Sequence, residues 1–119
     1  SGGSRPNPTP LYRVAKDWQA LQIHVAHGAW PWVMEMIGVA FVCPNIWLSA
    51  DEYLVAQIPG SEEYFKAANN YFSDRTVFGS SYPSRPIDQM VAAYIKWEWS
   101  AAVKPKIIRE NALRLIQMK

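Results

Sequence analysis

The chain has 119 residues, of which 50% are hydrophobic and 13% aromatic, and this composition excludes a protein that is disordered throughout. Its 12 basic and 10 acidic residues give a net charge of +2 with no long run of like charges, which argues against nucleic acid or an anionic membrane as a partner. The single cysteine, Cys43, cannot form an internal disulfide, and the N-terminus shows no signal-peptide pattern, so we expect a cytoplasmic location.

The predicted elements alternate between helices and strands within one domain over residues 1–119. Residues 1–10 are rich in Gly, Pro and Ser and are expected to form a loop or linker. Short apolar runs predict strands at residues 21–27, 45–49 and 75–81. Apolar residues at helical spacing predict helices at residues 11–18, 32–42, 62–72, 86–95 and 104–116. Ser61 is the expected N-cap of the third of these helices.

One stretch, residues 28–49, carries a single charge, Glu35. A bilayer span needs about 20 apolar residues, but Pro31 and Pro44 interrupt this stretch and Glu35 lies inside it. A helix followed by a buried strand therefore explains it better than a membrane span.

Strands that alternate with helices indicate a parallel sheet with crossover helices. Three strands of about six residues expose a face of roughly 270 Å² on the side that the helices leave bare. If that face stayed in water, the fold would lack about 7 kcal/mol of stabilisation from apolar burial. The free energy of unfolding of a whole domain is only about 5–15 kcal/mol. The pattern therefore predicts that the bare face meets something else: missing strands of a barrel, a second copy of the chain, or the N-terminal helix folded across it.

Three segments carry a resemblance to a known family. Residues 23–30 read Ile-His-Val-Ala-His-Gly-Ala-Trp, residues 76–83 read Thr-Val-Phe-Gly-Ser-Ser-Tyr-Pro, and residues 107–115 read Ile-Ile-Arg-Glu-Asn-Ala-Leu-Arg-Leu. In this order they resemble the sixth strand, the eighth strand and the closing helix of the amidohydrolase-related metal-dependent hydrolases and decarboxylases. The resemblance implies an α/β fold, the C-terminal part of a (βα)8 TIM barrel with about three βα units (strands 6 to 8), parallel strands and outer helices.

The resemblance also implies a divalent metal, usually zinc, which activates water or polarises a substrate oxygen in such barrels. The first-strand His-x-His pair and the fifth-strand histidine of the family are absent from this sequence. We therefore expect no complete metal site in this chain. The implied partner is a missing N-terminal barrel half or a second copy, and the implied substrate is a small molecule.

His27 corresponds to the sixth-strand histidine of the family, which contacts the substrate or the attacking water or lies near the metal. Ser81 stands at the position of the eighth-strand aspartate, and a neutral hydroxyl supplies neither an anionic ligand nor a base near neutral pH. Side chains alternate between the two faces of a strand, so Ile23, Val25 and His27 would share one face of the first strand, and Val77 and Ser81 one face of the third. His27 and Ser81 could then both project into the barrel mouth. Outside the resemblance, His27 could simply cap a strand end.

Four further residues are candidates, two of them with a functional alternative and two as structural residues. Asp51, which follows the second strand, could contact substrate, but a solvated loop is the favoured interpretation. Arg85 could pair with a substrate carboxylate through its guanidinium fork, or lie on the surface. His24 is expected to face the helices as a buried histidine, and Cys43 to be a small core residue.

Two functions remain open from the sequence. The first is the C-terminal portion of a metal-dependent hydrolase or decarboxylase acting on a small organic acid, lactone or amide, inactive alone and impaired by Ser81. The second is a non-catalytic half-barrel module that self-associates.

Overall fold

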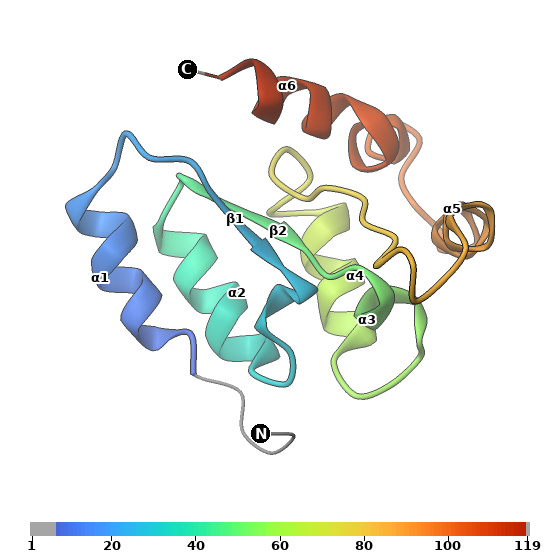
Figure 1. Cartoon of the computed structure of the whole chain (residues 1–119), viewed down its shortest axis with the longest axis horizontal. Helices are drawn as coiled ribbons and strands as arrows, with labels where there is room; N and C mark the ends of the chain where they lie inside the picture. The colour runs from blue at the N-terminus through green and yellow to red at the C-terminus, as the bar shows by residue number, and fades with distance from the viewer. Residues whose placement is uncertain (1–6, 119) are drawn as a thin grey trace.

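The computed structural model describes residues 7–118 (Figure 1). Its first half contains α1 (Thr9–Asp17), β1 (Ile23–Ala26), the 3-10 turn η1 (His27–Ala29), α2 (Val33–Val42), β2 (Ile46–Ser49) and α3 (Glu52–Val55). Its second half contains α4 (Ser61–Asn69), α5 (Ile87–Ile95), the π-helical segment η2 (Lys106–Glu110) and α6 (Asn111–Gln117). The loop expected over residues 1–10 lies mostly outside the described residues, and its last two residues belong to α1.

The strands β1 and β2 pair in parallel, as predicted, with Ile23 opposite Ile46 and Ala26 opposite Ser49. The third strand, expected over residues 75–81, is wrong in its length, because the segment makes a single parallel bridge between Leu48 and Thr76. Two hydrogen bonds flank that bridge, from the Leu48 N–H to the Arg75 carbonyl and from the Val77 N–H to the Leu48 carbonyl. The next amide, that of Phe78, donates instead to the Ile107 carbonyl at 3.1 Å, so the segment leaves the sheet there.

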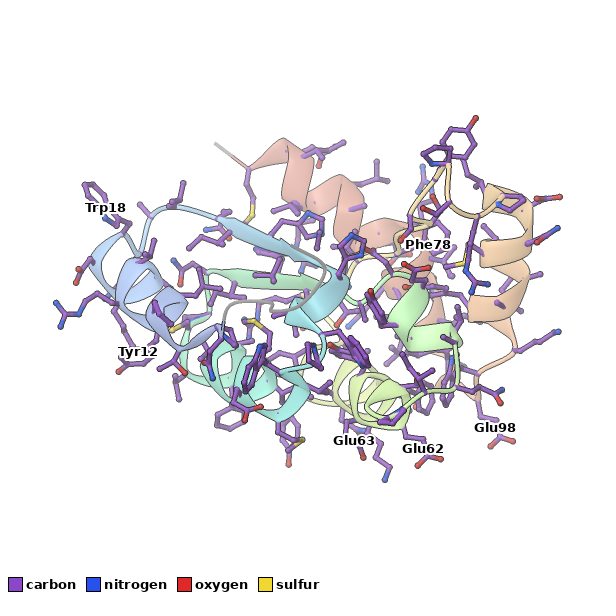
Figure 2. The ribbon with its side chains drawn as sticks, turned by 60° about the horizontal axis from the view of Figure 1, so that its bottom comes forward. Tyr12, Trp18, Glu62, Glu63, Phe78 and Glu98 are labelled. Carbon is purple, nitrogen blue, oxygen red and sulfur yellow. The ribbon has the colours of Figure 1, made fainter. Side chains whose placement is uncertain are left out.

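Helices lie on both sides of the paired strands. In Figures 1 and 2, α2 and α4 lie on one side of β1 and β2, and α6 lies on the other. The first side is filled by an apolar cluster to which strand residues such as Ile46 and Leu48 contribute together with Met36, Ala40 and Phe72. The predicted Cys43 core position is confirmed, since this residue is 1% exposed within the same cluster.

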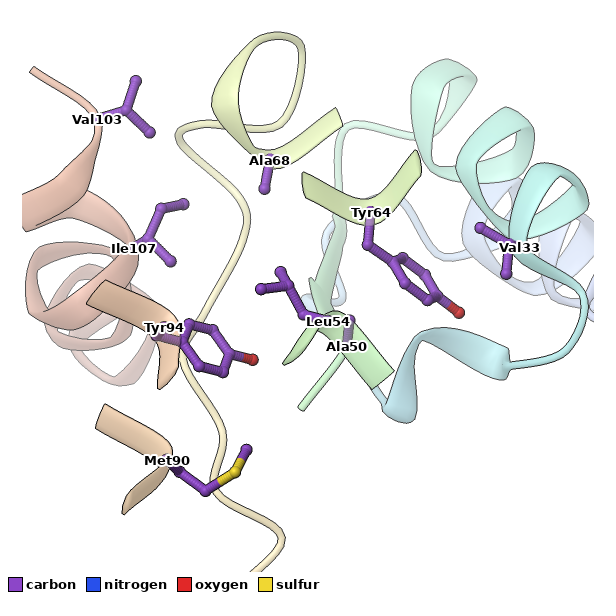
Figure 3. Packing of buried hydrophobic residues seen from close by; sticks show 9 residues of the cluster. All are labelled: Val33, Ala50, Leu54, Tyr64, Ala68, Met90, Tyr94, Val103 and Ile107. Atoms are coloured by element: carbon purple, nitrogen blue, oxygen red, sulfur yellow. The ribbon is translucent and has the colours of Figure 1, made fainter. Parts of the chain in front are cut away.

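A second apolar cluster joins α3, α4 and α5 to η2 (Figure 3). Its fully enclosed members include Leu54, Tyr94 and Ile107, all with no exposed surface. Burial of each large apolar side chain contributes roughly 1.5–3 kcal/mol to the stability of the fold. This cluster therefore holds α5 and η2 against α3, the helix that follows β2.

The bare face of the sheet is smaller than the sequence predicts. All four residues of β2 are buried, because Arg114 of α6 lies over the Trp47 ring, 5.0 Å from its centroid, on one side of the sheet. Exposure is confined to β1, where His24 and Ala26 are exposed and Ile23 and Val25 are half-buried. The predicted helix-facing, buried position of His24 is therefore wrong, since it is Ile23 and Val25 that pack into the cluster below the sheet.

Local sequence rules failed at three points. α3 stands where a loop was expected. Ser61 is the first residue of α4 and not its N-cap, which is Gly60 at φ 99°, and the Ser61 hydroxyl donates to the Tyr53 carbonyl at 2.7 Å. In the last helix the residues turned inward are Ile107 and Asn111, while Ile116 is 75% exposed. This helix opens with the π-helical segment η2, which takes more residues per turn than the α-helix that was expected.

Two buried asparagines tie the amino ends of the strands to the helices. The Asn45 amide donates to three carbonyls, those of Ala15 at 3.1 Å, Trp18 at 3.2 Å and Leu21 at 2.9 Å. The Asn111 amide donates to the carbonyls of Ser73 at 2.7 Å and Thr76 at 2.8 Å. Buried carbonyls need such partners, so each asparagine holds together segments that are distant in the sequence.

Arg75 closes the end of α2 in a similar way. Its Nη1 donates to the carbonyls of Ala40 at 3.2 Å, Cys43 at 3.0 Å and Ile46 at 2.7 Å, and partial burial lowers the pKa of the guanidinium. Arg75→Met should lower the free energy of unfolding by about 1–3 kcal/mol, because three carbonyls lose a charged donor. Urea denaturation measures this, with the exposed Arg13→Met as control, and equal stability of the two variants would contradict it.

Among residues 7–118, no helix has the length and apolar character that a membrane crossing requires.

Candidate functional site

Polar side chains gather where the strands end. β1 runs directly into His27, and β2 ends at Ser49, two residues before Asp51. The segment that pairs with β2 at Thr76 continues to Gly79 and Ser81. Parallel strands present their carboxyl ends at one edge of a sheet, the edge at which α/β proteins place their ligands.

Asp51 lies at the centre of this edge and is 6% exposed, so the favoured solvated-loop interpretation is wrong for this residue. Its Oδ1 accepts a hydrogen bond from the Ser49 hydroxyl. Its Oδ2 accepts the His27 backbone N–H at 3.1 Å and lies 3.1 Å from the His27 Nδ1. A buried carboxylate needs such partners, because an uncompensated charge in the interior is strongly unfavourable.

Gly79 and Tyr94 complete the surroundings of Asp51. A β-carbon at Gly79 would lie 1.8 Å from the Asp51 Oδ1 and 2.6 Å from the Ser49 Oγ, so a residue without a side chain is needed there. The Tyr94 hydroxyl donates to the Asp51 carbonyl at 3.0 Å. Burial, and then the nearby Asp51 charge, raise the pKa of Tyr94 far above its usual range, so this hydroxyl keeps its proton as a donor.

The backbone is strained at each of the three strand-end residues that the sequence singled out. His27, Asp51 and Ser81 have φ values of 61°, 56° and 58°, in a region that residues with side chains seldom occupy. Each such conformation costs of the order of 1–3 kcal/mol and persists only where the surrounding structure imposes it. Backbone strain of this kind clusters at functional sites.

Two polar atoms at this edge are buried without a hydrogen-bond partner, the His27 Nδ1 and the Ser81 Oγ. The His27 Nδ1 is in electrostatic contact with Asp51 at 3.1 Å, but the angle is not that of a hydrogen bond. The distance lies within hydrogen-bond range, but the imidazole would have to rotate for the bond to form. The Ser81 Oγ has no comparable neighbour, and the structure does not bring it into contact with His27.

An aromatic wall borders His27. The Tyr53 ring meets the imidazole edge-on at 5.8 Å between centroids. The same tyrosine stacks on Trp30 at 5.0 Å, and the Trp30 Nε1 donates to the Pro59 carbonyl at 2.9 Å. These contacts limit the orientations available to the imidazole.

Arg85 lies at the outer rim, where its side chain is 50% exposed and its Nε is 3.5 Å from Glu52 Oε2. Glu52 follows Asp51 directly, so of the two predicted substrate-binding residues Arg85 lies at the rim and Asp51 at the buried centre of the edge. Figure 2 shows other carboxylates, those of Glu62, Glu63 and Glu98, extending outward from the molecule.

The predicted basis for placing His27 and Ser81 on a common face is wrong for β1. Ile23 and Val25 turn toward the helices, and the chain leaves the extended conformation at His27 itself, the first residue of η1, with φ 61°. Sequence reasoning also missed Ser49, Gly79 and Tyr94 as partners of Asp51. The first two residues carried no signal of their own, and Tyr94 counted only as part of an apolar stripe.

Two hollows of the described surface lie away from this edge. A pocket of about 510 Å³ lies at the amino ends of the strands, beside Trp47 and Arg75. Another of about 520 Å³ lies between α4 and α5, beside Phe65 and Trp97.

A divalent metal does not fit the described residues alone. Within residues 7–118, no cluster of three or more His, Cys, Asp or Glu side chains could hold an ion. The edge offers His27 and Asp51, and the Ser81 hydroxyl is a poor substitute for a third anionic or imidazole ligand. Zinc sites in proteins use three or four such ligands.

The comparisons with known proteins agree with this geometry. A search of curated proteins finds no match. A solved structure described as an uncharacterized TIM-barrel protein, Bb4693 from Bordetella bronchiseptica, superposes with a TM-score of 0.89 at 38% identity. The match covers 94% of this chain and 40% of that protein, so the chain spans less than half the length of its structural neighbour. The Amidohydrolase family model matches residues 3–117, and the chain therefore belongs to the amidohydrolase family.

Proposed function

We propose that this chain is the C-terminal portion of an amidohydrolase-like barrel that hydrolyses or decarboxylates a small organic acid, lactone or amide. The observation that carries the proposal is the strained trio of His27, Asp51 and Ser81 at the carboxyl edge of the parallel strands. Backbone strain is retained where it holds side chains for a task, and this edge is where barrel enzymes place their chemistry.

His27 is the residue that acts on substrate or on the attacking water in this proposal. Its side chain is 44% exposed, so a substrate could reach the outer edge of the imidazole ring. Arg85, released from Glu52, would bind a substrate carboxylate. The burial of the Asp51 carboxylate disfavours a direct contact between Asp51 and substrate.

The proposed partner is the N-terminal half of the barrel, because β1 exposes His24 and Ala26 on the side where that half would pack. Because the described residues form no group that could hold a metal ion, the metal ligands in this proposal come from that half. The buried thiol of Cys43 is consistent with a reducing, cytoplasmic compartment.

Ser81 makes this copy a weak catalyst in the proposal, and restoring the acid tests the idea. Ser81→Asp, in a barrel reconstituted with the upstream part of the Bordetella neighbour and supplied with zinc, should raise turnover by roughly 10²–10⁴-fold. The left-handed backbone at Ser81 suits Asp, which tolerates that conformation. The measurement is hydrolysis of lactones and anilides, and release of CO₂ from small carboxylic acids.

Ser84→Asp is the matched control, since it adds the same charge to an exposed serine three residues further on. Equal turnover of the two variants, in a barrel shown to be assembled by sedimentation, would contradict the proposal. It would favour the second candidate, a non-catalytic module that self-associates through the exposed face of β1. That module predicts dimers of the chain alone, which sedimentation also detects.

A further inference from the structure

We propose that Asp51 is a positioning residue that fixes the His27 imidazole in one orientation and one tautomer, with the proton on Nδ1. The positioning can be tested without turnover. Only its catalytic consequence, a free Nε2 lone pair facing substrate, rests on the proposed function.

The carboxylate is itself held in place on both oxygens. Ser49 donates its hydroxyl to Oδ1, and the His27 backbone N–H donates to Oδ2 at 3.1 Å. Gly79 lies against Oδ1 so closely that no side chain fits between them. A carboxylate fixed in this way can impose an orientation on a neighbour, whereas a freely rotating one could not.

The backbone conformation of Asp51 also directs its carboxylate toward His27. Asp51 stands at the N-cap of α3, where aspartate usually turns its side chain to the helix amides, but no such capping bond forms. Its φ of 56° and ψ of −129° direct the carboxylate toward His27 instead. The Tyr94 hydroxyl, bound to the Asp51 carbonyl at 3.0 Å, braces this strained conformation from the apolar core.

His27 meets this carboxylate with its inner nitrogen. Nδ1 is buried 3.1 Å from Oδ2, while the side chain as a whole is 44% exposed, so the exposure falls on the other edge of the ring. An ionised carboxylate only accepts hydrogen bonds, so its position 3.1 Å from Nδ1 favours the tautomer of the neutral ring that carries the proton on Nδ1. Nε2 is then left unprotonated, and the Tyr53 ring restrains the imidazole from its side.

Nitrogen-15 NMR of the imidazoles in the full chain tests the assignment. The chain has two histidines, and His24, which is exposed on β1, serves as an internal reference. As the pH is raised until both rings are neutral, we expect the His27 nitrogens to show the Nδ1–H tautomer. His24 should show the ordinary mixture, in which Nε2–H predominates. A His24→Gln variant assigns the signals.

Asp51→Asn should move the two His27 nitrogen shifts toward those of His24, because the amide no longer enforces a proton on Nδ1. Glu52→Gln removes the adjacent carboxylate and should leave the shifts of His27 unchanged. An unchanged His27 spectrum in a folded Asp51→Asn chain would overturn the proposal.

The wild-type spectrum decides the matter even where Asp51→Asn fails to fold, since an Nε2–H tautomer at His27 overturns the proposal by itself. A barrel without turnover whose His27 carries its proton on Nδ1 would refute the proposed function and leave the positioning role intact.

Discussion

Gly79→Ala is expected to lower the free energy of unfolding by about 3–5 kcal/mol. The new methyl group would lie 1.8 Å from the Asp51 Oδ1 and 2.6 Å from the Ser49 Oγ. Relief requires Asp51 to leave its pocket, which adds the loss of its hydrogen bonds to the usual cost of overpacking. Urea denaturation measures the change. The nitrogen shifts of His27 should move as well, because its carboxylate partner is displaced.

Gly38→Ala is the matched control, because a β-carbon there meets nothing within 4 Å and the residue lies inside α2. It should be neutral or stabilising by up to about 1 kcal/mol. Combining Gly79→Ala with Asp51→Ala removes the obstructing carboxylate, so the two changes should cost less together than their sum. Strict additivity would show that the clash with Asp51 is not the cause.

Asn111→Ala is expected to lower the free energy of unfolding by about 2–4 kcal/mol. Asn111 is fully buried, and its amide donates to the carbonyls of Ser73 and Thr76. The substitution leaves both carbonyls without this donor and opens a small cavity. Hydrogen exchange should also accelerate at the Val77 amide, which is bonded to the Leu48 carbonyl at 2.8 Å next to the loosened segment.

Asn70→Ala is the matched control, because the Asn70 amide donates to the Lys66 carbonyl at 2.7 Å on the surface. This substitution should lower the free energy of unfolding by no more than about 0.5 kcal/mol. Asn111→Leu restores most of the volume without the donor. If it were as stable as the wild type, packing would explain the effect and the hydrogen bonds would not.

The alternation of helices and strands was predictable because it depends on local apolar periodicity. The segment around α2 shows this, since its expected range of 32–42 differs from the observed helix by one residue at the start. The family was also predictable, because its motifs are short and continuous in the sequence, and the match over residues 3–117 confirms it.

The predictions that were wrong concern residues whose conformation or burial depends on contacts with residues distant in the sequence. The segment after Arg75 leaves the sheet because the amide of Phe78 finds the carbonyl of Ile107, 29 residues further on. Asp51 is buried because Gly79, which belongs to another segment, makes room for it. The inward face of the last helix follows from its π-helical turn, which no periodicity of apolar residues indicates.

The two asparagine ties and the strained trio lie at opposite ends of the same short strands. The stabilising contacts at one end are therefore separated from the candidate site at the other, apart from the contact of Gly79 with Asp51. A library of variants at rim residues such as Tyr53 and Arg85 should consequently retain more folded members than one of equal size at Asn45 and Asn111. The fold should therefore tolerate sequence changes at the candidate site better than at the opposite end of the strands.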